Sequence, residues 1–201
     1  MKTILCIDTA SDRFALAVDR DGVVQSVETD AHHDHSRLLL PAIRELLGGE
    51  KPDAILVTIG PGAYAGVRVG IATAQGMALA SGIDVFGIGT LEATALAADL
   101  QDGAAIHPAG RGQFAVQRWE GGQAIGRPAV ADVESLGAAR IVGEGAGAFG
   151  GTEVSPRERV EAAVRARAPQ IRSGSLEPSA EAFYLREPNI TVSRRQSPAA
   201  S

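Results

Sequence analysis

The chain has 201 residues, of which 45% are hydrophobic and only 4% aromatic, and its formal net charge is −5. This hydrophobic content excludes a disordered chain, and the length suits one domain or two small lobes. The negative charge argues against a protein that holds nucleic acid by itself, because binding phosphate groups requires a basic surface.

The first hundred residues carry regular apolar patterns. A continuous apolar run, an alternating run and a third run behind the turn at Asp21 and Gly22 predict a β-meander. Helical and strand patterns then alternate, which indicates an α/β fold with a mixed sheet. Strands are expected at 3–8, 14–19, 23–29, 53–60 and 84–89, and helices at 35–49, 67–81 and 91–99.

The pattern is weaker after residue 103. Short apolar runs predict strands at 104–109, 113–120 and 139–144, with a hairpin turn at Gly121 and Gly122. Ser155 as a cap and Pro156 at the first helical position predict a helix over 155–169. We therefore expect an N-terminal lobe of residues 1–99 and a short C-terminal lobe of residues 100–201, frayed from about residue 188.

The single cysteine, Cys6, lies in the first apolar run and is expected to be a buried thiol. One cysteine can form neither a disulfide framework nor a zinc-binding set. Asp8 interrupts the apolar start, which is too short for a signal peptide, and no segment reaches the length of a membrane span. We expect a soluble, cytoplasmic protein.

A glycine-rich turn, "GPGAYAGVR", occupies residues 60–68 and invites comparison with phosphate-binding loops. A P-loop needs a lysine and a hydroxyl after its last glycine, but Val67 and Arg68 follow here. The dinucleotide fingerprint is G-x-G-x-x-G, and the glycines here are spaced one residue too widely.

A phosphate-gripping turn of the actin/hexokinase type is the third alternative. The segment "CIDTAS" supplies Asp8, Thr9 and Ser11, but Ala10 stands where close approach to a phosphate favours glycine. The simpler interpretation is architectural: the glycines allow a tight strand-to-helix turn close to the sheet.

Small residues recur every four positions in the helix after this turn. A glycine inside a helix costs about 1 kcal/mol relative to alanine, so this ridge needs a reason, either close packing on the chain's own sheet or contact with a partner. The preceding helix is apolar over more than one face, which favours a protein partner. The predicted partner interface comprises Leu38, Leu39, Leu40, Ile43, Leu47, Gly66, Val67, Gly70, Ile71, Ala74 and Ala78.

The remaining polar residues do not form an active site by sequence alone. His32, His33, Asp34 and His35 are too closely spaced to point toward one metal ion, and a solvated helix lead-in explains them better. No G-x-S-x-G motif supports a serine nucleophile. Asp8 and Glu92 could act as acid and base, but nothing in the sequence places them together.

Several motifs together resemble the TsaB (YeaZ) family. They are "ILCIDTAS", the "GPG-x-Y-x-GVRVG" stretch and "GIGTLEA", and the resemblance is close over residues 3–97 and loose thereafter. It implies an actin/hexokinase-like, ribonuclease H-like fold of two lobes. It also implies a role in making N6-threonylcarbamoyladenosine beside the anticodon of tRNAs that read codons starting with adenine.

The resemblance further implies the partners. TsaD, the threonylcarbamoyl transferase, would form a heterodimer with this chain, and the ATPase TsaE would join them. The apolar helix and the small-residue ridge, which would otherwise face water, predict that the chain alone forms a homodimer. Transfer RNA would be reached only through the complex. In "AIHPAGRGQF", Pro108 departs from the family pattern, which puts the contacts of the second lobe in doubt.

One departure separates this chain from its catalytic relatives. The resemblance implies that those relatives bind a metal through two histidines four residues apart, whereas Thr90 and Thr94 stand at these positions here. Threonine is a poor ligand for a transition metal. We therefore expect no catalytic residue, no metal and no cofactor in the isolated chain, with ATP or ADP only at the shared complex interface.

Three enzyme alternatives stay open at this point. They are a phosphotransferase of the actin/hexokinase type, a TsaD-like metal-dependent threonylcarbamoyl transferase, and a protease, for which no nucleophile is found.

Overall fold

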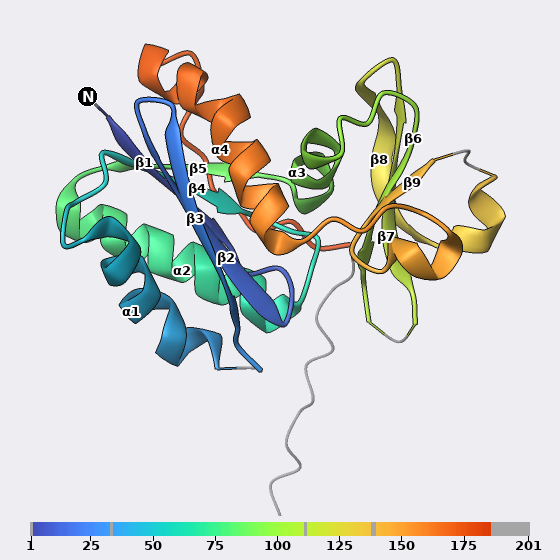
Figure 1. Ribbon diagram of the computed structural model, residues 1–201, viewed down its shortest axis with the longest axis horizontal. Helices are drawn as coiled ribbons and strands as arrows, with labels where there is room; N and C mark the ends of the chain where they lie inside the picture. Colours follow the sequence, from blue (N-terminus) through green and yellow to red (C-terminus); the bar gives the residue numbers. More distant parts are fainter. Residues whose placement is uncertain (1, 33, 111, 138–139, 186–201) are drawn as a thin grey trace, which may run out of the picture.

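The computed structural model describes residues 2–32, 34–110, 112–137 and 140–185. Two lobes lie side by side, each built on its own sheet (Figure 1). Within the described residues, no helix combines the length and the apolar character needed to cross a membrane.

The first lobe contains a five-stranded mixed sheet in the order β3-β2-β1-β4-β5. Strands β1, β2 and β3 pair antiparallel, whereas β4 and β5 continue the sheet in parallel with β1. This arrangement confirms the predicted meander and mixed sheet. The strands are β1 (Thr3–Asp8), β2 (Arg13–Arg20), β3 (Val23–Asp30), β4 (Ala54–Thr58) and β5 (Asp84–Ile88).

Helices cover both faces of this sheet. Helices α1 (His35–Leu47) and α2 (Tyr64–Ser81) pack on one face, and α3 (Thr90–Ala97) and α4 (Pro156–Ser173) lie on the other (Figure 1). Alternate residues of β1 therefore enter two cores. Leu5 and Ile7 face α1 and α2, while Ile4 and the free thiol of Cys6 are buried with α4.

The second lobe is a four-stranded sheet in the order β8-β7-β6-β9, which α3 contacts from the first lobe. The β7–β8 hairpin turns at Gly121 and Gly122, as predicted, and both glycines have a positive φ. The strands are β6 (Gly103–Pro108), β7 (Phe114–Glu120), β8 (Gln123–Ala131) and β9 (Ile141–Gly143), with short 3-10 helices at Val133–Leu136 and Ala146–Phe149.

All four helices differ in extent from the prediction, α1 and α3 by only one or two residues at an end. Helix α2 begins at Tyr64, three residues earlier than expected, and α4 continues through Pro169 to Ser173 because Ala168 and Ile171 still pack in the core. The predicted start of α4 is confirmed by a capping box, in which Ser155 and Glu158 bond each other's backbone amides.

The path of α4 also corrects the expected lobe boundary. This helix packs on β1, β2 and β3 of the first lobe, so the second packing unit is narrower than residues 100–201. The expected fraying from about residue 188 falls outside the described residues.

Candidate functional site

The glycine-rich turn packs against the chain's own β1–β2 loop. A Cβ on Gly62 would lie 2.6 Å from the carbonyl oxygen of Ala10, and one on Gly66 would lie 2.1 Å from that of Thr9. The amide of Ala63 donates a hydrogen bond of 2.7 Å to the Ala10 carbonyl. Because the two loops meet backbone to backbone, the glycines serve close packing at the ends of β1 and β4.

The small-residue ridge of α2 also faces inward. A Cβ on Gly70 would lie 2.2 Å from Oγ1 of Thr9, and Ala74 is fully buried against the sheet. This corrects the expectation that the ridge residues face a partner, since small side chains here let α2 sit close to its own lobe. The members of the predicted interface buried in this core are Leu39, Ile43, Leu47, Gly66, Val67, Gly70, Ile71 and Ala74.

The outer faces of α1 and α2 are the accessible part of this region. Leu40 is 52% exposed and Leu79 is 90% exposed, while Leu38 and Ala78 are half-buried. Contact between these helices and a partner therefore stays a prediction, now carried by the outer faces. Leu79 was not among the predicted interface residues, and it lies on the same outer face of α2 as the exposed residues Ala72 and Gly76.

A buried ion pair lies at the carboxyl end of β1. The side chain of Arg159, from α4, is fully buried, and its Nε donates to Oδ2 of Asp8 over 2.7 Å. The other carboxylate oxygen of Asp8 accepts from the Ala10 amide at 2.9 Å and from Oγ1 of Thr58 at 3.1 Å. Both carboxylate oxygens of Asp8 are thus bonded to groups of its own chain.

Arg159 also connects this aspartate to the second lobe. Its two terminal nitrogens donate to Oε2 of Glu144 at 3.2 Å and to Oγ of Ser11 at 2.9 Å, and Ser11 also donates to Glu144. Glu144 follows β9, so the guanidinium joins the two lobes. A hollow of about 720 Å³ between the lobes has Ser11, His107 and Glu144 of this cluster in its wall.

The buried charges shift the ionisation of this cluster. Burial alone would raise the pKa of Asp8, but the charge and hydrogen bond of Arg159 offset it and hold the pKa below its usual value. Burial opposes the charged form of Arg159, yet Asp8 and Glu144 raise its pKa. The pair is therefore ionised and neutral overall at physiological pH.

His107 of β6 completes the cluster and is kept neutral. Burial, followed by the charge of Arg159, lowers the pKa of His107 to about 4, although Glu144 and Asp8 act in the opposite direction. Its Nε2 lies 3.2 Å from the Ala10 carbonyl oxygen, an acceptor, so this nitrogen carries the proton. Nδ1 is buried without a hydrogen-bond partner in the described part of the chain.

The sequence prediction missed Arg159. Its signal was its position on the apolar stripe of α4, beside Val160 and Ala163, where an arginine needs a buried partner.

The other candidate residues named from the sequence do not come together in one site. Thr90 and Thr94 are fully buried, and Oγ1 of Thr94 donates to the Thr90 carbonyl over 2.8 Å. Glu92 pairs with Arg167 of α4 while Asp8 pairs with Arg159, so the two carboxylates do not form an acid–base pair.

The histidine cluster divides in the same way. Nε2 of His35 lies 2.9 Å from the Ser11 carbonyl oxygen, and exposed His32 pairs with Asp30, while His33 lies outside the described residues. Among the residues that the structure describes, no three His, Cys, Asp or Glu side chains are grouped to hold a metal.

Comparison with known proteins places these features in context. The family model described as TsaD, tRNA N6-adenosine threonylcarbamoyltransferase, matches residues 18–136. The TsaB protein of Escherichia coli K12, a tRNA threonylcarbamoyladenosine biosynthesis protein, is 35% identical over 106 residues, which are 50% of this chain and 46% of that protein. The TsaB protein of Bacillus subtilis 168 is 34% identical over 119 residues, or 55% of this chain and 52% of that protein.

A tRNA N6-adenosine threonylcarbamoyltransferase of Nitratidesulfovibrio vulgaris DP4 is 35% identical over 121 residues, covering 49% of this chain and 34% of that enzyme. The chain thus spans about half the length of the TsaB relatives that it matches. The solved structure of YeaZ from Pseudomonas aeruginosa aligns with a TM-score of 0.73 and 24% identity over 92% of this chain and 100% of that one. The structural likeness confirms the predicted fold class.

Proposed function

We propose that this chain, which belongs to the TsaD family, is an accessory subunit in the synthesis of N6-threonylcarbamoyladenosine in tRNA, and its likeness to TsaB biosynthesis proteins supports this role. In this proposal TsaD transfers the threonylcarbamoyl group, and this chain pairs with TsaD and activates it. TsaE joins the pair, and the modified adenosine lies beside the anticodon of tRNAs that read codons starting with adenine.

The observation that carries the accessory role is the pairing of the polar residues in the wall of the hollow between the lobes. Ser11 and Glu144 of this wall are bonded by the buried guanidinium of Arg159, which also neutralises Asp8. The backbone of Ala10 is packed against Gly62 rather than open toward a phosphate. These features favour a supporting role over phosphoryl transfer.

The alternative of a metal-dependent transferase in its own right is disfavoured by α3. Thr90 and Thr94 stand at the positions of the two metal-binding histidines that the family resemblance implies for catalytic members, and both are fully buried. Hydroxyl groups do not fit a transition metal that prefers imidazole. We therefore propose that the isolated chain binds neither this metal nor a nucleotide.

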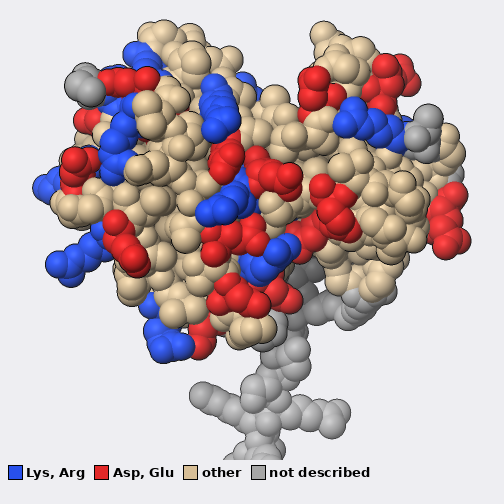
Figure 2. Space-filling model, in the orientation of Figure 1, with Lys and Arg blue, Asp and Glu red and all other residues tan. Residues whose placement is uncertain are grey.

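The surface charge favours an indirect contact with tRNA. On the face shown in Figure 2, lysine and arginine side chains of the described residues are interspersed with carboxylates over the first lobe. This face is not the continuous basic surface that binding to a phosphate backbone needs, and the net charge of the chain is −5. We therefore propose that tRNA is held by the complex.

The test is a reconstituted threonylcarbamoyl-transfer assay with tRNA and the TsaD and TsaE of the same organism. We expect modified adenosine when this chain and TsaD are both present, and none from this chain without TsaD. Calorimetry of the isolated chain with Mg-ATP and with zinc should show no stoichiometric binding in the micromolar range. Product formation without TsaD, or full TsaD activity without this chain, would overturn the proposal.

A further inference from the structure

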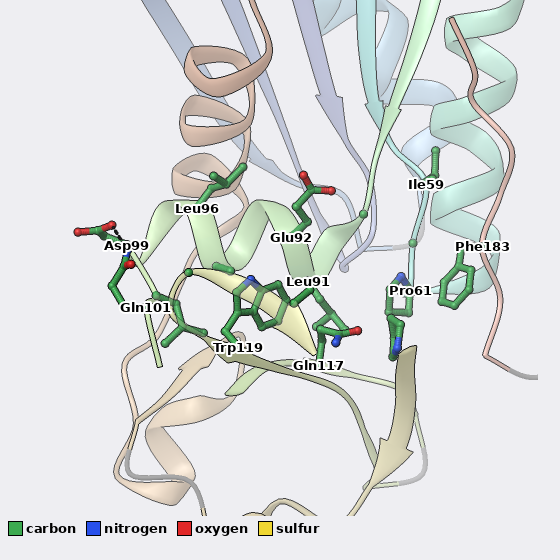
Figure 3. Close-up of a pocket in the computed structure, with 17 residues that line it drawn as sticks. Ile59, Pro61, Leu91, Glu92, Leu96, Asp99, Gln101, Gln117, Trp119 and Phe183 are labelled. Atoms are coloured by element: carbon green, nitrogen blue, oxygen red, sulfur yellow. Dashed lines mark hydrogen bonds between the residues drawn. The ribbon is translucent and has the colours of Figure 1, made fainter. Parts of the chain in front are cut away.

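A second cavity lies on the other side of the glycine-rich turn, between α3 and the β7–β8 hairpin (Figure 3). Its volume is about 560 Å³, within the range of roughly 300–1,000 Å³ that is typical of small-molecule sites. The loop at Ile59 and Pro61 and the side chain of Phe183 close one end, and Asp99 and Gln101 stand at the other.

The walls of this cavity are mainly apolar and include the only tryptophan of the chain, Trp119. Its indole ring lies on the β7 side, across from Leu91 of α3 (Figure 3). Pro61 and Phe183 add flat surfaces at the closed end. Aromatic and proline surfaces of this kind bind another flat ring by stacking and edge contacts.

A buried glutamine supplies a fixed polar group. The β7–β8 register shifts between Val116 and Arg118, and Gln117 lies at this irregularity. Its amide nitrogen donates to the Ile125 carbonyl oxygen over 2.7 Å, which fixes the side chain. The amide oxygen of Gln117 receives no hydrogen bond from the described residues, so a ligand can donate to it.

The ionisable residues that line this cavity are acidic. Glu92 directs its carboxylate toward Arg167 of α4, whereas Asp99 holds Nε2 of Gln101 at 3.1 Å at the open end. No lysine or arginine lines the cavity within the described part of the chain. Because Arg167 balances the charge of Glu92, the lining offers hydrogen-bond acceptors and, at the open end, the carboxylate of Asp99, and it disfavours a phosphate or carboxylate.

We propose that this cavity binds a small, flat aromatic molecule that carries an amine or another N–H donor. The ring lies against Trp119, and the donor is directed to Gln117 or toward Asp99. The cavity is separate from the Arg159 cluster, so this binding neither requires nor excludes the accessory role proposed above.

The test uses the fluorescence of Trp119, because a single tryptophan reports on this cavity alone. The probes are 2-phenylethylamine and phenylacetate, which share a ring and differ in charge. For a ligand of about nine heavy atoms we expect an apparent Kd in the roughly millimolar range, with the amine binding at least about tenfold more tightly than the acid. Equal affinity for the two probes, or no saturable change with the amine, would overturn the proposal.

Two variants locate the site. Ala124 lines the cavity and pairs across the strands with Trp119, so Ala124→Phe should fill the space and weaken amine binding at least about tenfold. Gln123→Phe adds the same ring one residue before Ala124 on β8, at an exposed side chain that does not line the cavity. This control should bind like the parent chain, and equal losses in both variants would refute the location.

A third variant tests the charge. Asp99 has a positive φ of 46°, a conformation that asparagine also tolerates. Asp99→Asn should therefore preserve the fold, keep an acceptor for Gln101 and reduce the preference for the amine over the acid several-fold. An unchanged preference would show that Asp99 does not select the ligand. Thermal melting of each variant ensures that only folded protein is compared.

Discussion

His107 is an imidazole buried next to a guanidinium, and it stays neutral because the surroundings disfavour a second positive charge. Its pKa of about 4 lies well below the value of about 6.5 of a histidine in an unfolded chain. Between these two values the unfolded state binds more protons than the folded state. Stability therefore rises with pH in this window and is lost as the pH falls from about 6.5 to 4.

We predict that His107→Gln flattens this part of the stability profile. Glutamine can still donate to the Ala10 carbonyl, but it cannot take up a proton, so a contribution on the order of 3 kcal/mol between pH 6.5 and 4 disappears. Urea denaturation of both proteins at a series of pH values measures the effect. Parallel profiles for parent and variant would show that His107 titrates normally.

Asp8 contributes to the stability of the folded chain in a different pH range. Because Arg159 lowers the pKa of this carboxylate, its stabilising effect is present above the unfolded pKa and is lost as the pH falls through the lower folded value. This loss begins near pH 4, below most of the range in which His107 acts. The two residues can therefore be distinguished by pH alone.

Two glycines of helix α2 lie in different surroundings, one in close packing contact and one without a neighbour. Gly70 lies against Thr9, whereas a Cβ on Gly76 would meet no heavy atom within 4 Å. Both glycines weaken the helix by about the same amount relative to alanine. Only the surroundings distinguish them.

We predict opposite effects for the two alanine substitutions. Gly76→Ala should raise the free energy of unfolding by up to about 1 kcal/mol through helix propensity. Gly70→Ala should lower it by about 1–3 kcal/mol, because the new methyl group collides with Oγ1 of Thr9 in a packed core. Chemical denaturation of the two variants provides the comparison.

A double variant checks the cause. Thr9→Ala combined with Gly70→Ala removes the colliding oxygen, so part of the lost stability should return. Gly70→Ala as stable as Gly76→Ala would contradict the observed packing of α2.

Much of the element order follows from the sequence, and the errors have a common physical origin. The meander, the helices of the first lobe and the cap of α4 were predicted because local periodicity and capping chemistry determine them. Periodicity also identified Gly66, Gly70 and Ala74 as one face of α2. It could not tell which surface that face meets, since a sheet and a partner helix both favour small residues.

The same limit explains the missed residues of the site. Arg159 meets Asp8 from 151 positions away, and Trp119 meets Leu91 only when the two lobes fold together. The apolar stripe of α4 indicates that Arg159 needs a buried partner, but no local pattern identifies the partner of either residue. Helix α4 packs on the first sheet, and this long-range packing creates the Arg159 site. The sequence prediction assigned α4 to the second lobe, because no local pattern shows which sheet a helix covers.

At the scale of the whole molecule, the chain crosses between the lobes more than once. It leaves the first lobe after α3, builds the second sheet and returns as α4 (Figure 1). Arg159 therefore lies on an element of the first lobe while it contacts Glu144, which follows the last strand of the second. The buried cluster and the cavity beside Trp119 are both products of this arrangement.

The outer face of α2 presents an apolar side chain to solvent. Leu79 is 90% exposed there, and Leu40 of the neighbouring α1 is 52% exposed. The proposed pairing with TsaD and the predicted homodimer would both cover this face. In a two-fold dimer each residue of the interface is used twice, so a single substitution acts on two copies.

We predict that Leu79→Glu weakens self-association at least about tenfold, because it loses apolar burial and places two carboxylates at the interface. Sedimentation at tens of micromolar should show a dimer for the parent chain and a monomer for the variant. Melting should change little, since surface substitutions usually alter stability by about 0.5 kcal/mol or less. Val23→Glu is the matched control, at an apolar side chain of β3 that is 67% exposed but outside α1 and α2. If both variants dimerise like the parent, the outer face of α2 is not the interface; if only Leu79→Glu dissociates and also fails to bind TsaD, the two partners use the same surface.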